Sequence, residues 1–425
     1  MEKPRSLYMS YDGMMEPLGQ SQVVAYLTRL AEDFTIHLIS FEKRSDTDRS
    51  EAAQSMHRAL ARSGIVWHPQ RYHKRPKLVS TVYDMARAAI VAVAVARRGR
   101  IRVMHARSLL SAAMILPALY VCKGRLVFDI RGFWTDERVE GGVVARGSIV
   151  ERALRVLERA IFHRADHIVT LTRSSVALLR DDPRFGRPRA PITVIPTCAD
   201  LDLFTPEDDR SGDRSGEPFT VGYVGQIGPW YRFDAMIALY AAFVRRRPDA
   251  RMLVVNRSQQ AEVRRAFQAA GIVENRSEIV AASRSDVAGH IRRMDVGIVL
   301  MIDAFSNFAR APTKLAEYLA CGIPCVGDAQ VGDLQAILDG ERVGVTLRDH
   351  TPGEYDRAVD RILAATDDAG LAARCVASAR RHFSLEDGAA RYRAIYLSLL
   401  EEHPPEHLEE HPSEQLEDRS LDGGA

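Results

Sequence analysis

Short runs rich in β-branched residues alternate with longer helical patterns along almost the whole chain, and this alternation restricts the fold more than any other feature. The runs are apolar throughout, rather than at every second position, which is typical of parallel strands covered by helices on both faces. The predicted strands are 7–11, 36–41, 65–69, 103–107, 125–130, 167–172, 192–196, 219–225, 250–256, 278–283, 296–301, 323–327 and 343–347. The sequence therefore predicts an α/β fold with doubly wound, Rossmann-like sheets.

A polar segment rich in Gly, Ser and Pro separates the strands into two groups and is predicted to be a linker. The 425 residues have room for about two domains. The predicted division is an N-terminal domain (1–204), the linker (205–218), a C-terminal domain (219–384), a last helix (385–402) and a disordered acidic tail (403–425). Two such domains have ligand crevices at the carboxyl ends of their strands, so they are expected to face an interdomain cleft.

Helices are predicted at 21–33 and 148–164 among others. Ser148 followed by Glu151 has the spacing of a capping box, and apolar residues recur on one face of that segment. The segment 85–96 is apolar on all sides and is predicted to be a buried helix. No signal-peptide pattern precedes the first strand, and no apolar stretch reaches the roughly 20 residues of a membrane-spanning helix.

Composition excludes several classes of protein. A net charge of +2, from 58 basic and 56 acidic residues, gives no sign of nucleic-acid binding. Hydrophobic and charged contents of 46% and 27% are those of a soluble globular protein. The five cysteines have no zinc or disulfide spacing and are expected to be cytoplasmic thiols. Neither a metal ion nor a cofactor is predicted.

Lys314 is the only lysine after position 123 in a chain that otherwise uses arginine for positive charge there. Pro312 suits the first turn of a helix, so Thr313 and Lys314 would lie at the positive end of a helix dipole. Arg310 adds a second full charge, and together these groups suit the diphosphate of a departing nucleotide. Glu317, one turn further on, would accept hydrogen bonds from sugar hydroxyls. The alternative is a lysine that simply reaches solvent.

Two further turns between strand and helix carry unusual residues. In 10–24, Gly13 and Gly19 precede a helix that opens with Gln20, although the spacing is not that of a dinucleotide fingerprint. A purely structural turn is the alternative there. In 128–142 a strand leads into a loop that is crowded with charged and aromatic residues, as binding loops often are. These residues are Asp129, Arg131, Phe133, Trp134, Asp136, Glu137 and Arg138, for which a solvated, salt-bridged loop is the alternative.

Several segments together resemble the family 4 retaining glycosyltransferases. "PTKLAEYLACGIPCV" (312–326) resembles the donor-binding segment, in which a Glu-x7-Glu motif runs into a helix end. "ADHIVTLTRSS" (165–175) and "ITVIPTCADLDLFTP" (192–206) resemble the signature around the interdomain crossing. "VGYVGQIGPWYRFDAMI" (221–237) and "DGMMEPLGQSQVVAYLTRLA" (12–31) correspond to two further segments of the family. The resemblance covers about residues 5–400 and implies the two-domain GT-B fold, with the last helix returning to the N-terminal domain.

The chain departs from the family pattern at the donor site. Glu317 matches the second glutamate of the motif, but the first falls on Ala309. The basic pair expected in the loop at 225–231 falls on Gln226 and Tyr231. We expect Arg310 and Lys314 to replace the missing charge. Trp230 and Tyr231 would then offer a flat surface to the sugar or base.

These considerations predict three groups of site residues. The predicted catalytic residues are Glu317, Lys314, Asp129 and Arg131. The predicted donor-binding residues are Gly225, Trp230, Tyr231, Asn256, Arg310, Thr313, Lys314 and Glu317. The predicted acceptor-side residues are Gly19, Gln20, Trp134 and Glu137.

The resemblance implies transfer of a sugar, with retention, from a nucleotide-sugar to a saccharide or lipid-linked acceptor, without a metal bound by an Asp-x-Asp motif. Cell-surface polysaccharide or glycoconjugate biosynthesis is the expected setting. Two alternatives stay open, a non-catalytic partner protein with the GT-B fold and a nucleotide-sugar epimerase. Basic residues at 71–77 and 97–102 bracket the apolar segment 85–96, so peripheral contact with the inner face of the plasma membrane is also expected. Arginine-rich helix ends without any such role are the alternative.

Overall fold

The computed structural model describes residues 3–43, 50–73, 77–206 and 216–401. The N-terminal domain contains a seven-stranded sheet with the order β3-β2-β1-β4-β5-β6-β7, in which every pair of neighbours is parallel. Its strands are β1 (Arg5–Ser10), β2 (Thr35–Glu42), β3 (Ile65–Arg71), β4 (Val103–Arg107), β5 (Arg125–Asp129), β6 (His167–Thr170) and β7 (Ile192–Val194).

The C-terminal domain contains a six-stranded parallel sheet with the order β10-β9-β8-β11-β12-β13. Its strands are β8 (Thr220–Val224), β9 (Arg251–Val255), β10 (Ser277–Val280), β11 (Val296–Val299), β12 (Cys325–Asp328) and β13 (Gly344–Leu347). Both sheets have the doubly wound order, with the topological switch next to the first strand of each domain. The prediction of two parallel sheets is confirmed, and each predicted strand has its counterpart.

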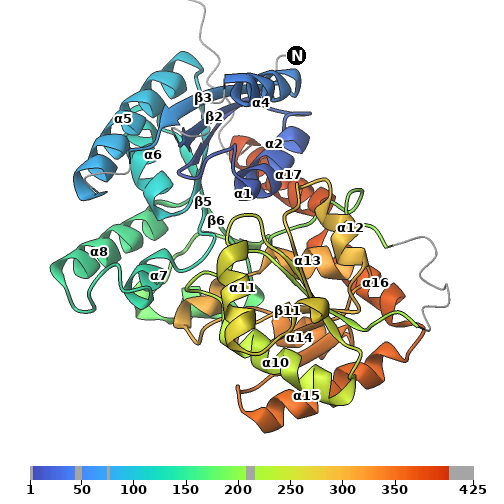
Figure 1. Ribbon diagram of the computed structural model, residues 1–425. Coiled ribbons are helices and arrows are strands. Elements are labelled where there is room, and N and C mark those ends of the chain that lie inside the picture. Colours follow the sequence, from blue (N-terminus) through green and yellow to red (C-terminus); the bar gives the residue numbers. More distant parts are fainter. Residues whose placement is uncertain (1–2, 44–49, 74–76, 207–215, 402–425) are drawn as a thin grey trace, which may run out of the picture.

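Helices cover both faces of the N-terminal sheet (Figure 1). One face packs against α5 (Lys77–Arg98), α6 (Leu109–Val121) and α8 (Ile149–Arg164), through buried residues such as Ala88, Ala112 and Ile161. The other face packs against the π-helix η1 (Gln20–Val24), α2 (Ala25–Leu30) and α4 (Ser50–Arg62), and the short α1 (Pro17–Gly19) leads directly into η1. The predicted helix at 21–33 therefore begins earlier and contains a π-helical turn. The remaining elements are α7 (Trp134–Glu140), α9 (Arg173–Asp181) and η2 (Pro183–Phe185).

The start of α8 shows how the sequence sets a helix boundary. The Ser148 hydroxyl accepts a hydrogen bond from the Glu151 backbone N–H at 3.1 Å, as the capping-box spacing predicts. The Glu151 carboxylate in turn accepts from the Gly147 N–H at 2.6 Å, one residue before the position the motif implies.

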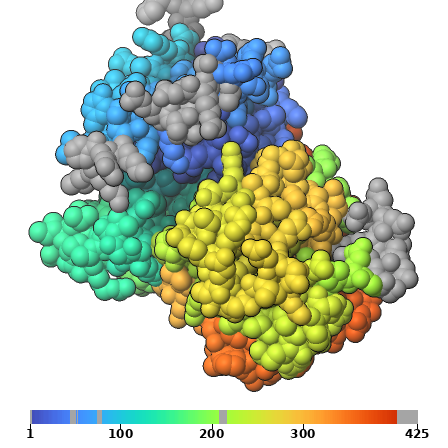
Figure 2. Space-filling model, in the orientation of Figure 1, coloured from blue at the N-terminus to red at the C-terminus, as the bar shows by residue number. Residues whose placement is uncertain are grey.

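The C-terminal sheet is likewise covered on both faces, and its last helix leaves the domain. Its helices are α10 (Phe233–Arg246), α11 (Gln260–Ala269), η3 (Glu274–Arg276), α12 (Val287–Arg292), η4 (Phe305–Ala309), α13 (Thr313–Ala320), α14 (Leu334–Leu338), α15 (Pro352–Thr366), α16 (Leu371–Phe383) and α17 (Leu385–Glu401). The last of these, α17, crosses to the N-terminal domain and packs against α2 and β4. Tyr392 and Tyr396 of α17 are buried there with Tyr26 and Leu27 of α2. Figure 2 shows the two domains in contact, the first in blue to teal and the second in yellow to orange.

The expectation that 85–96 forms a buried helix is wrong in part. The segment lies in α5, which buries one stripe of small residues against the sheet and exposes large apolar residues on its other side. The prediction that no apolar stretch is long enough to span a membrane is also wrong. Within the described residues one stretch, Val79–Arg98, is long and apolar enough to cross a membrane by length and composition alone. Core helices of soluble proteins meet the same criteria of length and composition. In this fold 28% of the apolar stretch is buried.

Residues 207–215 of the predicted linker and the predicted tail 403–425, together with residue 402, lie outside the described residues. The same holds for residues 74–76 of the basic run.

Candidate active site

Three segments predicted from the sequence meet between the two domains. They are the start of α13, the loop 225–231 after β8, and the loop 130–141 after β5, which contains α7. The loops after β5 and β8 leave the carboxyl ends of their strands, where doubly wound sheets bind ligands.

Lys314, in the first turn of α13, is buried with 6% of its surface exposed. Its ammonium has no hydrogen-bond partner among the described residues. It lies 4.0 Å from the centre of the Tyr223 ring and 4.1 Å from that of Tyr231. Burial lowers the pKa of Lys314 to about 7, against the opposing effect of Glu317. A buried ammonium that contacts two aromatic rings and has no hydrogen-bond partner among the described residues favours the binding of an anion.

Gly225 leaves room for this ammonium. A Cβ atom at Gly225 would lie 3.1 Å from the Lys314 Nζ, and the φ of +121° also disfavours any other residue. Asn256, which is fully buried, holds the same loop: its Nδ2 donates to the Gly225 carbonyl at 2.9 Å. Its Oδ1 accepts from the backbone N–H groups of Ser258 and Gln259. Asn256 therefore positions the loop, and its predicted contact with a ligand stays a prediction.

Glu317 lies one helical turn after Lys314. Burial raises the pKa of Glu317 to about 7, while Arg284 and Lys314 act in the opposite direction. Arg284 follows β10, and burial lowers its pKa while Glu317 opposes that shift. Arg284 and Tyr223 are not among the residues predicted from the sequence. The sequence contains a signal for Arg284, because a basic residue directly after the strand predicted at 278–283 lies where parallel sheets bind ligands.

Arg310 is not a free cation in this arrangement. Its guanidinium forms an ion pair with Glu137 of the other domain at 3.1 Å and stacks on the Trp230 ring at 4.1 Å. The Arg310 Nε has no hydrogen-bond partner among the described residues. Burial raises the pKa of Glu137, and Arg310 opposes that shift. The Trp230 ring in turn lies close to Gly141 of the other domain. A Cβ atom added at Gly141 would lie 3.1 Å from the Trp230 ring. The structure thus brings Arg310 and Trp230, predicted to bind the donor, next to Glu137, predicted to lie on the acceptor side, across the domain boundary.

Further hydrogen bonds join the domains beside this pair. The Glu140 carboxylate accepts from the backbone N–H groups of Phe305 at 2.7 Å and Ser306 at 3.3 Å. The Thr172 hydroxyl donates to the Phe308 carbonyl at 2.6 Å. Ala309, at the position of the first motif glutamate, is fully buried in the apolar cluster that also contains Phe133. No carboxylate is therefore presented at this position.

Asp129 and Arg131, which were predicted to be catalytic, lie under α17. Asp129 is 1% exposed, and its Oδ2 accepts from the Tyr392 hydroxyl at 2.9 Å. His105 Nε2 and Arg131 Nη1 each lie 3.6 Å from the same oxygen. Although burial acts to raise the pKa of Asp129, Arg131 and His105 hold it below its usual value. These contacts are those of an anchor for α17, and a catalytic role stays a prediction.

The other predicted residues have mainly structural contacts. Gly19 is required by packing, because a Cβ there would lie 2.1 Å from the Gly13 carbonyl oxygen. The Gln20 amide donates to the Met15 carbonyl at 3.4 Å. Trp134 packs partly buried on the N-terminal core, with the Arg138 guanidinium 4.8 Å from its ring centre. Thr313 is the first residue of α13.

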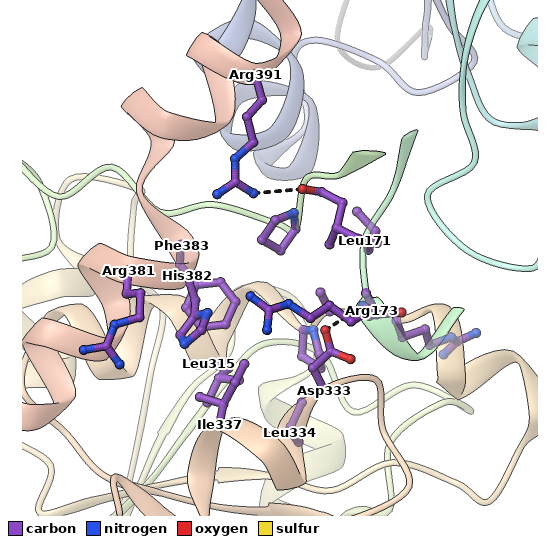
Figure 3. Close-up of a pocket in the computed structure, with 16 residues that line it drawn as sticks. Leu171, Arg173, Leu315, Asp333, Leu334, Ile337, Arg381, His382, Phe383 and Arg391 are labelled. Atoms are coloured by element: carbon purple, nitrogen blue, oxygen red, sulfur yellow. Dashed lines mark hydrogen bonds between the residues drawn. The ribbon is translucent and has the colours of Figure 1, made fainter. Parts of the chain in front are cut away.

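A cavity of about 70 Å³ lies where the chain crosses between the domains, near the start of α13 (Figure 3). Arg310 and Pro312 line it, but Lys314 and Glu317 do not. At its edge the Asp333 carboxylate accepts from the backbone N–H groups of Arg173 at 2.7 Å and Ser174 at 3.0 Å, and so caps α9 from the other domain. The cavity is separate from the environment of Lys314.

Comparison with known proteins gives consistent results. A family model described as "Glycosyl transferase 4-like domain" matches residues 20–198, and one described as "Glycosyl transferases group 1" matches residues 204–382. The D-inositol 3-phosphate glycosyltransferase of Gordonia bronchialis is 26% identical over 239 residues, which are 54% of this chain and 52% of that protein. The alignment thus spans about half the length of that relative.

Two solved structures share the fold. Sucrose-phosphate synthase from Thermosynechococcus elongatus has a TM-score of 0.71 at 19% identity, over 94% of this chain and 100% of that chain. Anabaena HepE in complex with UDP-glucose has a TM-score of 0.62 at 16% identity, over 93% and 99%. At these identities the likeness establishes the architecture alone.

Proposed function

The chain belongs to the group 1 glycosyl transferases, within glycosyltransferase family 4, and from this premise we propose that it transfers a sugar from a nucleotide-sugar to an acceptor hydroxyl with retention. The observation that carries this proposal is the buried ammonium of Lys314, which lies between Tyr223 and Tyr231 and has no hydrogen-bond partner in the described part of the chain. A cation in such a place is stabilised when an anion binds beside it. The diphosphate of a nucleotide-sugar is the anion that this family of enzymes releases.

The same ammonium favours the reaction itself. When the bond between the sugar and the diphosphate breaks, negative charge grows on the leaving oxygen, and a preorganised cation there lowers the barrier. Glu317 lies one helical turn after Lys314. Because its pKa is near 7, its carboxyl group can donate a hydrogen bond to a sugar hydroxyl or accept one from it. In the proposed mechanism the departing diphosphate accepts the proton of the acceptor hydroxyl, and the new bond forms on the face that the leaving group vacates.

The choice of donor and acceptor is part of the proposal. UDP-glucose is the first donor to test, since HepE shares the fold and binds it. A saccharide or lipid-linked saccharide is the proposed acceptor, in the synthesis of a cell-surface polysaccharide or glycoconjugate. D-inositol 3-phosphate, named for the Gordonia relative, is the soluble acceptor with which to compare it.

The test is release of nucleoside diphosphate from a set of UDP- and GDP-sugars, with and without acceptors. Acceptor-dependent release with a retained anomeric configuration supports the proposal. Conversion of the donor to its epimer without acceptor favours an epimerase, and donor binding without turnover favours a non-catalytic partner. Lys314→Met should abolish release, whereas Lys123→Met, the same change at an exposed lysine, should leave it unchanged.

A further inference from the structure

The outward side of α5 is apolar where a helix at the surface of a soluble domain is normally polar. Buried residues recur along α5 at intervals of four, and they are small or polar: Ser80, Asp84, Ala88, Ala92 and Ala96. Large apolar residues lie on the opposite side, with Val79 67%, Tyr83 56% and Ile90 71% exposed. The helix therefore points its most hydrophobic side away from the core.

The exposed side of α5 continues onto the end of α6. A shallow groove of about 610 Å³ runs between the two helices, lined by Ala89, Ile90, Val93, Ala94, Arg97, Arg98 and Pro117. Tyr120 and Val121, at the end of α6, are 69% and 53% exposed. We call the exposed residues of α5 together with this groove and the end of α6 the α5–α6 surface. Large contiguous apolar areas of this kind mark interaction sites.

The charge of the α5–α6 surface has one sign. The sequence contains no acidic residue between Asp84 and Asp129, a stretch that includes exposed Arg87, Arg97 and Arg98. Asp84 is itself buried, with its carboxylate 2.6 Å from the His73 ring nitrogen. On the neighbouring segment after α8, Asp166 is already paired with Arg125 at 2.7 Å and with Arg164 at 2.8 Å.

The exposed apolar area and the positive charge together indicate the kind of partner. A second copy of the chain, related by a twofold axis, would set the arginines of both copies against a surface without acids, which is unfavourable. An anionic bilayer matches both properties, since it offers an apolar interior beneath negative headgroups. We propose that the α5–α6 surface docks onto an anionic lipid bilayer. The inference goes beyond the proposed function and does not depend on it.

The fold indicates that α5 lies on the bilayer and does not span it. Ala88, Ala92 and Ala96 are fully buried against the sheet, so extraction of α5 would open the N-terminal core. In Figure 1, α5 lies on the side of its domain that faces away from the C-terminal domain. Docking there leaves the boundary between the two domains uncovered. Residues 74–76 lie outside the described residues, and the proposal does not use them.

The experiment is co-sedimentation of the full chain with vesicles. Phosphatidylcholine vesicles containing phosphatidylglycerol are compared with vesicles of phosphatidylcholine alone, at about 0.1 M and about 1 M salt, between which the Debye length falls from about 10 Å to about 3 Å. We expect binding to the anionic vesicles at low salt only. Arg97→Glu with Arg98→Glu should weaken it at least about 25-fold, at about fivefold for each lost basic residue. Ile90→Asp should weaken it as well.

Matched controls separate this surface from general charge and from misfolding. Arg264→Glu with Arg265→Glu makes the same charge change on exposed residues of α11, and Val273→Asp makes the same kind of apolar change in the C-terminal domain. Both controls should bind vesicles as the wild type does. The proposal is overturned by no binding at low salt, by equal binding to neutral vesicles, or by equal loss in the controls. It is also overturned if Ile90→Asp changes the mass measured by light scattering, because the surface would then join two copies.

Discussion

The affinity for a nucleoside diphosphate is expected to fall as the pH rises above about 7. Burial lowers the pKa of Lys314 from 10.5 to about 7, and this change corresponds to roughly 5 kcal/mol between the two protonation states. A diphosphate beside the ammonium favours the charged form, so binding above pH 7 must take up a proton. Each further pH unit then lowers the affinity by up to about tenfold.

Glu317 acts in the same direction. Its pKa is raised to about 7, so its carboxyl group becomes negative over the same range and repels the ligand. Two variants separate the contributions. Glu317→Gln should keep the part of the pH dependence that Lys314 causes. Lys314→Met should lose that part and bind at least about tenfold more weakly near pH 7, since a charged hydrogen bond contributes about 1.5–3 kcal/mol.

The assay is titration calorimetry of UDP between about pH 6.5 and about pH 8.5, in buffers with different heats of ionisation. The heats give the number of protons taken up, which we expect to approach one above pH 7 in the wild type. Lys314→Met serves as the control for protonation of UDP itself. Equal pH dependence in the wild type and Lys314→Met, or no proton uptake in either, would refute the reasoning.

The same pKa shift makes the free energy of unfolding depend on pH. Because the pKa of Lys314 is lower in the folded state, the unfolded chain binds more protons between about pH 7 and 10.5. The destabilising effect of Lys314 is therefore fully present below pH 7 and is relieved as the pH rises through this window. Urea unfolding should show that rise in the wild type and not in Lys314→Met.

Two further substitutions, together with Glu317→Gln in a second assay, test the contacts described above. Arg310→Ala should weaken UDP binding less than Lys314→Met does in the same calorimetric assay, because the guanidinium is already paired with Glu137. Glu317→Gln should lower turnover without a matching fall in melting temperature; parallel losses would indicate a structural role instead. Tyr392→Phe removes the hydroxyl that donates to the buried Asp129, so it should lower the free energy of unfolding by about 1–3 kcal/mol in urea titrations while UDP affinity stays unchanged.

The sheets were predictable from the sequence because buried parallel strands are apolar along their whole length, so each appears as a short uninterrupted run. The orientation of α5 was also predictable, because Ala88, Ala92 and Ala96 recur at intervals of four. Overall apolarity concealed that stripe, because the outward residues are larger and more hydrophobic than the inward ones.

The sequence indicated only part of what surrounds Lys314. The helix start at Lys314 is a local pattern and Tyr231 was predicted through the family resemblance, whereas Tyr223 lies inside the strand predicted at 219–225, where no pattern distinguishes it. The pairing of Arg310 with Glu137 depends on how two domains meet, which no local pattern encodes. The burial of Asp129 depends on Tyr392, which is 263 positions away in the chain.

Because α17 returns to the N-terminal domain, that domain is built from two segments that are far apart in the sequence. Its apolar residues on α2, such as Tyr26 and Leu27, are covered by Tyr392 and Tyr396. During synthesis these residues are made only after the C-terminal sheet, so the nascent N-terminal domain leaves the ribosome with an apolar surface that stays open until the C-terminal domain has also emerged. A chaperone that binds exposed apolar segments has its opportunity in that interval. Once α17 is in place, neither domain can unfold without disturbing the other, and calorimetry should show a single transition.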